Sequence, residues 1–172
     1  MSALRFVRSV LKNFQAESGL EPRYERAFPL FSRVSVKLIL RFDITDEAYN
    51  SASQPLFFSF WIRVTAAEPG RVDFELDIKK EHTNRLNIMH GGTIASMVDL
   101  GGSLAVASRG LYATGVSTDL NVTYLNSGGQ VGDVLKAVVK CDKFGKTLAY
   151  TSIQFTNSKG EIAARGSHTK YA

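Results

Sequence analysis

The sequence lacks several features that would assign it to whole classes of protein. It contains one cysteine, Cys141, so no disulfide can form within the chain, and a reducing compartment suits it. Its apolar runs are shorter than the roughly 18 residues that span a bilayer, which predicts a soluble protein. The basic residues are scattered and are not interleaved with aromatic residues, which disfavours nucleic-acid binding.

Common catalytic and metal-binding motifs are missing as well. No G-x-S-x-G nucleophile motif occurs. Residues 144–147 resemble the end of a phosphate-binding loop, but Lys140 stands where that motif needs its first glycine. The histidines and Cys141 do not have the spacing of metal ligands, so we expect no metal and no cofactor; the histidines are His82, His90 and His168.

The composition that remains is that of an ordinary globular protein. The 172 residues are 44% hydrophobic and 22% charged, which fits one domain with a modest extension. The formal net charge of +5, from 21 basic and 16 acidic residues, is compatible with a membrane surface or an anionic small molecule as partner.

The first 28 residues form one section. Leu4, Val7, Leu11 and Phe14 recur at helical spacing, with arginines between them and no acid before Glu17. Two interpretations remain open: a mitochondrial presequence, or a helix that folds onto the domain. We therefore expect the protein in mitochondria or in the cytoplasm.

Residues 29–60 form a second section without sustained periodicity, which predicts an atypical, poorly ordered insertion with a short strand at Val34 to Leu40. An alternative is that about residues 31–60 are translated intron sequence, because QPLFFSF requires pyrimidine-rich codons.

Residues 61–172 carry strong patterning and form the third section. In RVDFELDIK apolar and charged residues alternate, which predicts a strand with one wet face. Similar strands are expected at 116–125, 133–142, 147–157 and 162–171. Residues 92–108 are apolar or small nearly all round, which predicts a buried helix. The expected fold class is α+β: a long central helix wrapped by an antiparallel sheet of about five to six strands.

Asp99 is the only charged residue between His90 and Arg109, on this helix. Burying an unpaired carboxylate costs several kcal/mol, so we expect either a functional group or a carboxylate that is hydrogen-bonded to backbone groups or paired with a basic residue from a strand. Burial favours the protonated form, which would suit a general base working near neutral pH.

The residues just before the helix offer hydrogen-bond donors. The N–H groups of Gly91 and Gly92 have no partner within a helix that begins there, and they lie at its positive end, where an oxyanion could bind. The alternative interpretation is that the two glycines only form a tight turn into the helix and bind no oxyanion. Asn84 and His90 are nearby polar groups with either a functional or a structural role.

The segments HTNRLNIMHGGTIASMVD, GVSTDLNVTYL, GKTLAYTSIQFTN and ARGSHTKY resemble hotdog-fold thioesterases, in the branch with the phenylacetate-pathway thioesterases and acyl-CoA thioesterase 13. The resemblance covers about 110 residues. It implies hydrolysis of medium- or long-chain or aryl acyl-CoA in lipid metabolism, with CoA as part of the substrate. It also implies edge-to-edge dimers, commonly assembled into tetramers.

Site roles also follow from the resemblance. It implies that Asn84 and the Gly91 N–H polarise the thioester carbonyl, that Asp99 acts as general base or nucleophile, and that Ser117 positions the water. His90 would orient the site, and Asn84 and Asp99 would come from different subunits. Surface cations would meet the CoA phosphates; the candidates are Lys143, Lys146, Arg165 and Lys170.

Two alternatives remain. A hotdog enoyl-CoA hydratase would have a histidine five residues after the aspartate, where this chain has Leu104. A non-catalytic acyl-CoA-binding module is the other, although every catalytic position of the resemblance is filled.

Overall fold

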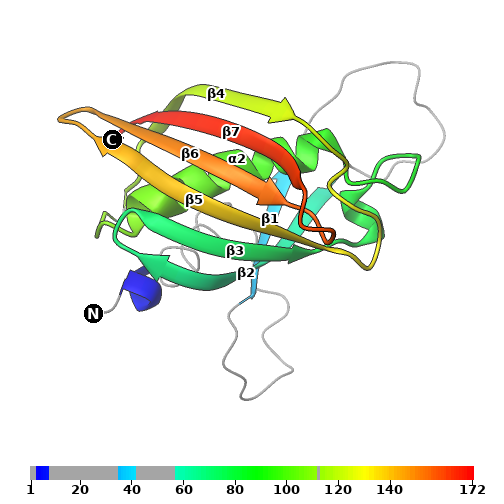
Figure 1. Cartoon of the computed structure of the whole chain (residues 1–172). Coiled ribbons are helices and arrows are strands. Elements are labelled where there is room, and N and C mark those ends of the chain that lie inside the picture. Colours follow the sequence, from blue (N-terminus) through cyan, green and yellow to red (C-terminus); the bar gives the residue numbers. More distant parts are fainter. Residues whose placement is uncertain (1–2, 8–34, 42–56, 112) are drawn as a thin grey trace.

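The computed structural model describes residues 3–7, 35–41, 57–111 and 113–172. Seven strands form one antiparallel sheet in the order β1-β2-β3-β5-β6-β7-β4 (Figure 1). The strands are β1 Ser35–Arg41, β2 Phe57–Glu68, β3 Arg71–Asp77, β4 Val116–Tyr124, β5 Val134–Phe144, β6 Leu148–Thr156 and β7 Ile162–Tyr171.

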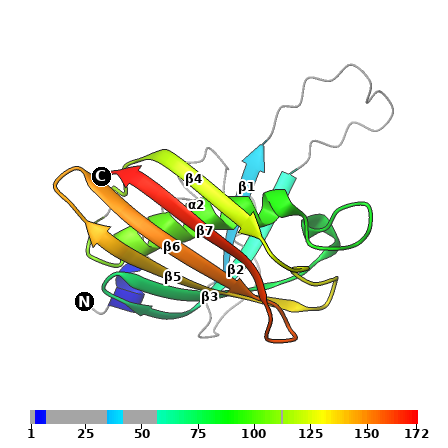
Figure 2. The same ribbon diagram turned by 45° about the horizontal axis from the view of Figure 1, so that its top comes forward.

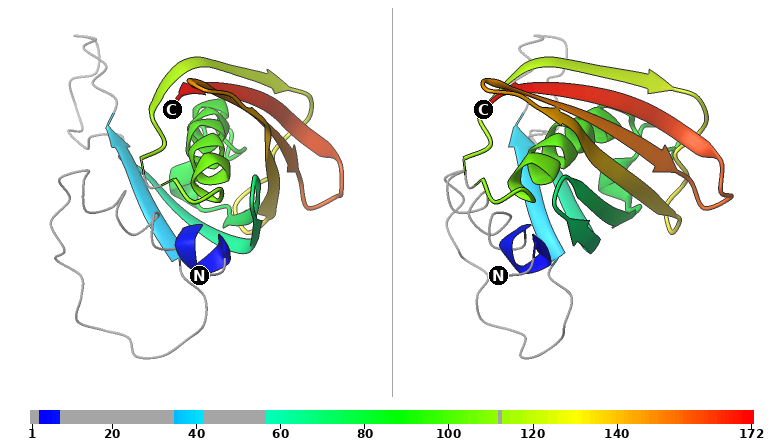
Figure 3. Two further views of the ribbon diagram at one scale, coloured as in Figure 1. Left: turned by 90° about the vertical axis from the view of Figure 1, so that its left-hand side faces the viewer. Right: turned by 60° about the vertical axis from the view of Figure 1, so that its left-hand side comes forward.

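One long helix, α2 Gly91–Ala107, lies within the curve of this sheet, as the end-on view in Figure 3 shows. It is buried at every position from Leu100 to Ala107 because strands surround it. A short 3-10 helix, η1 Lys80–His82, precedes it. The prediction of a buried central helix wrapped by an antiparallel sheet is therefore confirmed.

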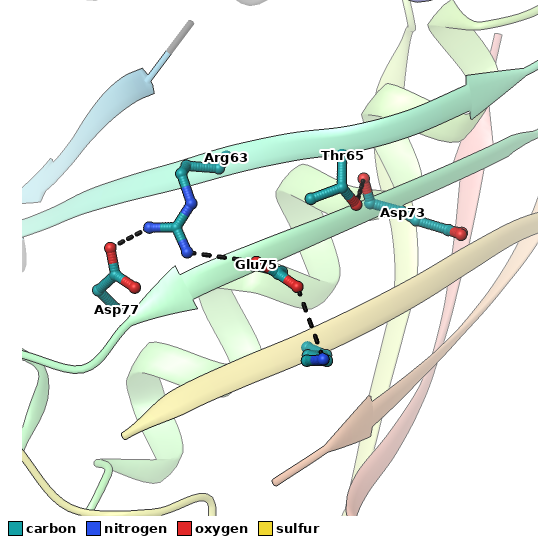
Figure 4. Close-up of polar contacts among 6 residues, drawn as sticks. Arg63, Thr65, Asp73, Glu75 and Asp77 are labelled. Carbon is teal, nitrogen blue, oxygen red and sulfur yellow. Dashed lines mark hydrogen bonds and ion pairs between the residues drawn. The ribbon is translucent and has the colours of Figure 1, made fainter. Parts of the chain in front are cut away.

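The alternating strands bury their apolar residues against α2 and present charges on the outer face. Leu76 and Phe74 of β3 are at most 1% exposed. On the outer face, Arg63 of β2 forms ion pairs with Glu75 and Asp77, and Lys136 of β5 lies 3.8 Å from Glu75 (Figure 4). The wet face predicted for this strand is confirmed, and cations of adjacent strands cover its carboxylates.

The structure extends the sheet into the section expected to be an insertion. β1 lies at nearly the predicted place and pairs with β2, at the opposite edge of the sheet from β4 (Figure 2). β2 begins at Phe57, four residues before the expected start of the domain at residue 61. Residues 3–7 are helical, with Val7 fully buried in the core. The other residues of the sections 1–28 and 29–60, apart from these strands, lie outside the described part.

No helix in the described part of the chain has both the length and the apolar character needed to cross a membrane.

One prediction about the strands is wrong. The apolar side of β4 was expected to be buried, but Val116, Leu120 and Tyr124 are 66%, 40% and 52% exposed. β4 is an edge strand that pairs with β7 along one side, and none of its residues is buried in the single chain. An exposed strand edge of this kind is an open template for pairing with another chain.

Candidate active site

The structure brings Asp99 together with two side chains from the last strands of the sheet. The Ser117 hydroxyl of β4 donates a hydrogen bond to Asp99 Oδ1 over 3.2 Å. His168 of β7 places its Nε2 2.8 Å from Ser117 Oγ and 3.3 Å from Asp99 Oδ1. β4 and β7 pair directly, so residues 51 positions apart in sequence meet over the helix.

The surroundings of His168 favour the neutral form of its imidazole. Its ring is fully buried, and burial lowers its pKa, with a smaller contribution from the charge of Lys170. Nδ1 has no hydrogen-bond partner among the described residues and faces α2 near Gly102. A proton on Nε2 would donate toward Ser117 and Asp99, and it would leave Nδ1 as a bare lone pair. This tautomer leaves Ser117 free to donate its own proton to Asp99.

The burial expected for Asp99 is not present in the single chain, because its side chain is 49% exposed. The edge strand β4 covers it on one side only, through Ser117. The carboxylate is therefore anchored by hydrogen bonds at Oδ1 and open to solvent. Both of these contacts come from side chains of β4 and β7, one a serine and the other a histidine.

The start of α2 forms a second polar cluster. His90 caps the helix, with its Nδ1 accepting a 2.9 Å hydrogen bond from the Gly92 N–H. The Tyr124 hydroxyl donates to the Gly91 carbonyl over 2.8 Å, and its ring lies over Gly91. Burial raises the pKa of Tyr124, so this hydroxyl keeps its proton. Within the described residues the Gly91 N–H donates to no acceptor, which leaves it available to a ligand.

Asn84 lies in the loop before α2. Its Oδ1 accepts hydrogen bonds from the N–H groups of Leu86 and Ile88, over 2.8 and 3.3 Å. These bonds fix the amide orientation and leave Nδ2 as its donor end. The backbone N–H of Asn84 also bonds to the Ile88 carbonyl, so the loop is closed on itself.

The two polar clusters are well separated along the helix. Asp99 follows Gly91 by eight residues, which corresponds to about 12 Å along an α-helix. A thioester carbonyl and the water that attacks it lie about 3 Å apart. The Gly91 N–H and the Asp99 carboxylate of one chain are thus separated along the helix by more than the distance between the two reacting partners.

Three of the four candidate phosphate-binding cations, Lys143, Lys146 and Arg165, are exposed. The prediction of a surface cation is wrong for Lys170, which is 3% exposed. Lys170 lies on the same face of β7 as His168, two residues away, and this face packs against α2. Sequence reasoning also missed His168 and Tyr124 as parts of the two clusters. The alternation in ARGSHTKY was the signal that could have placed His168 on the inner face.

A central helix carrying a carboxylate, held in a curved antiparallel sheet whose edge strand supplies a serine to that carboxylate, defines the hotdog class of thioesterases. The comparisons with known proteins agree. The sequence profile described as the thioesterase superfamily matches residues 86–164. The chain is 48% identical over 110 residues to a Schizosaccharomyces pombe protein, covering 64% of this chain and 68% of that protein.

Two further relatives bear on the activity. Human acyl-coenzyme A thioesterase 13 is 39% identical over 111 residues, which cover 64% of this chain and 79% of that protein. The crystal structure of zebrafish thioesterase superfamily member 2 superposes with a TM-score of 0.61 at 36% identity, covering 64% of this chain and 80% of that one. The chain belongs to the thioesterase superfamily, and it is a thioester hydrolase.

Proposed function

We propose that the protein hydrolyses acyl-CoA thioesters whose acyl group is a medium or long chain or an aryl group. The observation that carries this proposal is the Asp99 carboxylate anchored at Oδ1 by Ser117 and His168, while half of its side chain stays open. A named relative, human acyl-coenzyme A thioesterase 13, supports acyl-CoA as the substrate class. The exposed cations Lys143, Lys146 and Arg165 are the proposed contacts for the CoA phosphates.

In the proposed reaction Asp99 takes a proton from water, and the water oxygen forms a bond to the thioester carbon. Ser117 holds Asp99 and the water in place. The Gly91 N–H and the Asn84 amide donate to the carbonyl oxygen as its negative charge develops, and His90 holds the helix turn that presents Gly91. Collapse of the intermediate breaks the C–S bond and releases the CoA thiolate. Direct attack by Asp99 is the alternative that the same cluster allows.

We propose that the site is completed by a second copy of the chain. The separation of about 12 Å along α2 between Gly91 and Asp99 supports a site whose two clusters come from different copies. Antiparallel pairing of two β4 strands, centred on Asn121 and allowing for the register shift between Ser117 and Asp119, would place Ser117 opposite Tyr124 of the second copy. Because Tyr124 binds Gly91, this register brings each Asp99 near the other copy's carbonyl-binding cluster. A homodimer is thus the minimal active unit, and a homotetramer would pair two of them.

The decisive variant is Asp99→Asn, which keeps the shape of the side chain and removes its basicity. We expect release of free thiol from octanoyl-CoA, palmitoyl-CoA and phenylacetyl-CoA to fall by about 100-fold or more. Asp142→Asn is the matched control, because Asp142 is an exposed carboxylate that also accepts a serine hydrogen bond, from Ser152. Wild-type turnover in Asp99→Asn with an unchanged circular dichroism spectrum would refute the assignment. The ranking of the three substrates gives the acyl preference.

A further inference from the structure

Lys170 is the one buried lysine or arginine among the residues whose side chains are described. The other lysines of that part of the chain are exposed, whereas Lys170 retains 3% of its surface. Burying an ammonium group is unfavourable unless a negative charge compensates for it. A nearby carboxylate would offset part of this cost for Lys170.

The ladder between β4 and β7 places Lys170 beside the Asp99 cluster. Lys170 is the direct register partner of Ser117, which binds Asp99. It shares the inner face of β7 with His168, which also contacts Asp99. Burial lowers the pKa of Lys170, and the negative charge of Asp99 opposes that change. Asp99 is thus the carboxylate that interacts electrostatically with the Lys170 ammonium.

Lys170 makes no direct ion pair or hydrogen bond through its ammonium within the described part of the chain. The Lys170 ammonium is therefore not engaged in a structural ion pair within this part of the chain. The titratable groups that face Asp99 are His168 and Lys170 from β7, and Asp119 lies nearby on β4. His168 is neutral and Asp119 is negative, so Lys170 supplies the only positive charge of this group.

Resting on the proposed function, we propose that Lys170 is a positioning residue that keeps Asp99 ionised while an acyl-CoA thioester and the second copy cover the site. Covering the half-exposed Asp99 removes water that stabilises its negative charge. The nearby ammonium replaces part of that stabilisation. Its charge also disfavours a second proton on His168, whose Nε2 lies 2.8 Å from Ser117 Oγ.

The test is the pH profile of kcat for the full chain with octanoyl-CoA, between about pH 5 and 8.5. In Lys170→Met the Asp99–His168 pair should take up its proton at higher pH, which moves the acid limb upward by on the order of one pH unit. The rate above that limb should stay within about threefold of the wild type. Lys170→Arg should keep the wild-type limb because it keeps the charge, and Lys140→Met on the exposed face of β5 is the matched control.

An acid limb of Lys170→Met that coincides with the wild type would overturn the proposal. A purely structural role would instead lower the melting temperature and the rate at all pH values without moving the limb, which also overturns it. If Lys170→Met does not fold, Lys170→Gln carries the same measurement. Should Asp99→Asn retain full activity, the proposed function itself fails; if only the limb of the Lys170 variants stays fixed, this inference alone fails.

Discussion

Gly115 offers a sharp test of how β4 positions Ser117, the serine of the proposed site. Its backbone has φ +74°, and a Cβ atom built there would lie 1.7 Å from the Tyr171 carbonyl oxygen. Gly110 has φ +97°, with nothing within 4 Å of its built Cβ. The two glycines thus share an unusual backbone conformation, but Gly115 alone lies against another strand.

The expected cost of each alanine follows from these two geometries. Gly110→Ala should lose about 1–2 kcal/mol of unfolding free energy from left-handed strain. Gly115→Ala carries the same strain. In addition, the new Cβ atom clashes with the Tyr171 carbonyl oxygen, and relieving this clash must separate the start of β4 from the end of β7. Losing two ladder hydrogen bonds there adds about 1–3 kcal/mol. At about 2–4 °C per kcal/mol, Gly115→Ala should lose roughly twice the melting temperature that Gly110→Ala loses.

The same displacement should reach the site, because Ser117 lies two residues after Gly115. Opening the pairs Val116–Tyr171 and Ser117–Lys170 moves the serine away from Asp99. A displacement of about 1 Å in a positioned group can cost on the order of 100-fold in rate. We therefore expect kcat for octanoyl-CoA to fall by about 10- to 100-fold in Gly115→Ala and by less than about twofold in Gly110→Ala. Equal melting temperatures and equal rates in the two variants would refute the reasoning.

Two other variants probe the remaining contacts. The pKa of His168 lies below its ordinary value of 6.5, so the unfolded chain binds a proton first, and stability should fall as the pH drops below about 6.5 toward the folded value. His168→Gln should flatten this part of a urea-unfolding series between about pH 7.5 and 5; an unchanged slope would contradict the burial argument. Tyr124→Phe removes the hydroxyl that binds the Gly91 carbonyl and keeps the ring, so kcat/KM should fall about 3- to 10-fold with little loss of stability. Full kcat/KM in that variant would show that the bond does not position Gly91.

The sequence was sufficient for the architecture because the strands and the helix have different apolar periods. Alternation in β3 identifies a strand with a charged outer face, and the Arg63–Glu75 pair now accounts for how those charges are satisfied. The uniform apolar character of α2 identifies a helix enclosed on all sides. The start of β2 at Phe57 was missed, since its aromatic cluster follows a polar stretch and has no clear period.

The site was predictable where one residue contradicted its surroundings, and it was not predictable where a residue looked ordinary. Asp99 stood out as a charge on an apolar helix. His168 and Lys170 were less visible because histidine and lysine are common in exposed strands. The available signal was their spacing along β7. Residues two positions apart in a strand lie on the same face, so once His168 faces the helix, Lys170 must face it too. Placing either residue beside Asp99 also requires the pairing of β4 with β7, which is a long-range contact.

The second copy proposed above would explain both the exposure of β4 and the separation of the two polar clusters. The expected burial of Asp99 and of the apolar side of β4 would both follow if another β4 strand paired along this edge. Asp99 follows Gly91 by eight residues, about 12 Å along the helix, so a second copy would bring the proposed carbonyl-binding group of one chain to the proposed base of the other. Substitutions that block β4 pairing should therefore abolish hydrolysis even though each chain keeps its own Asp99–Ser117–His168 cluster intact.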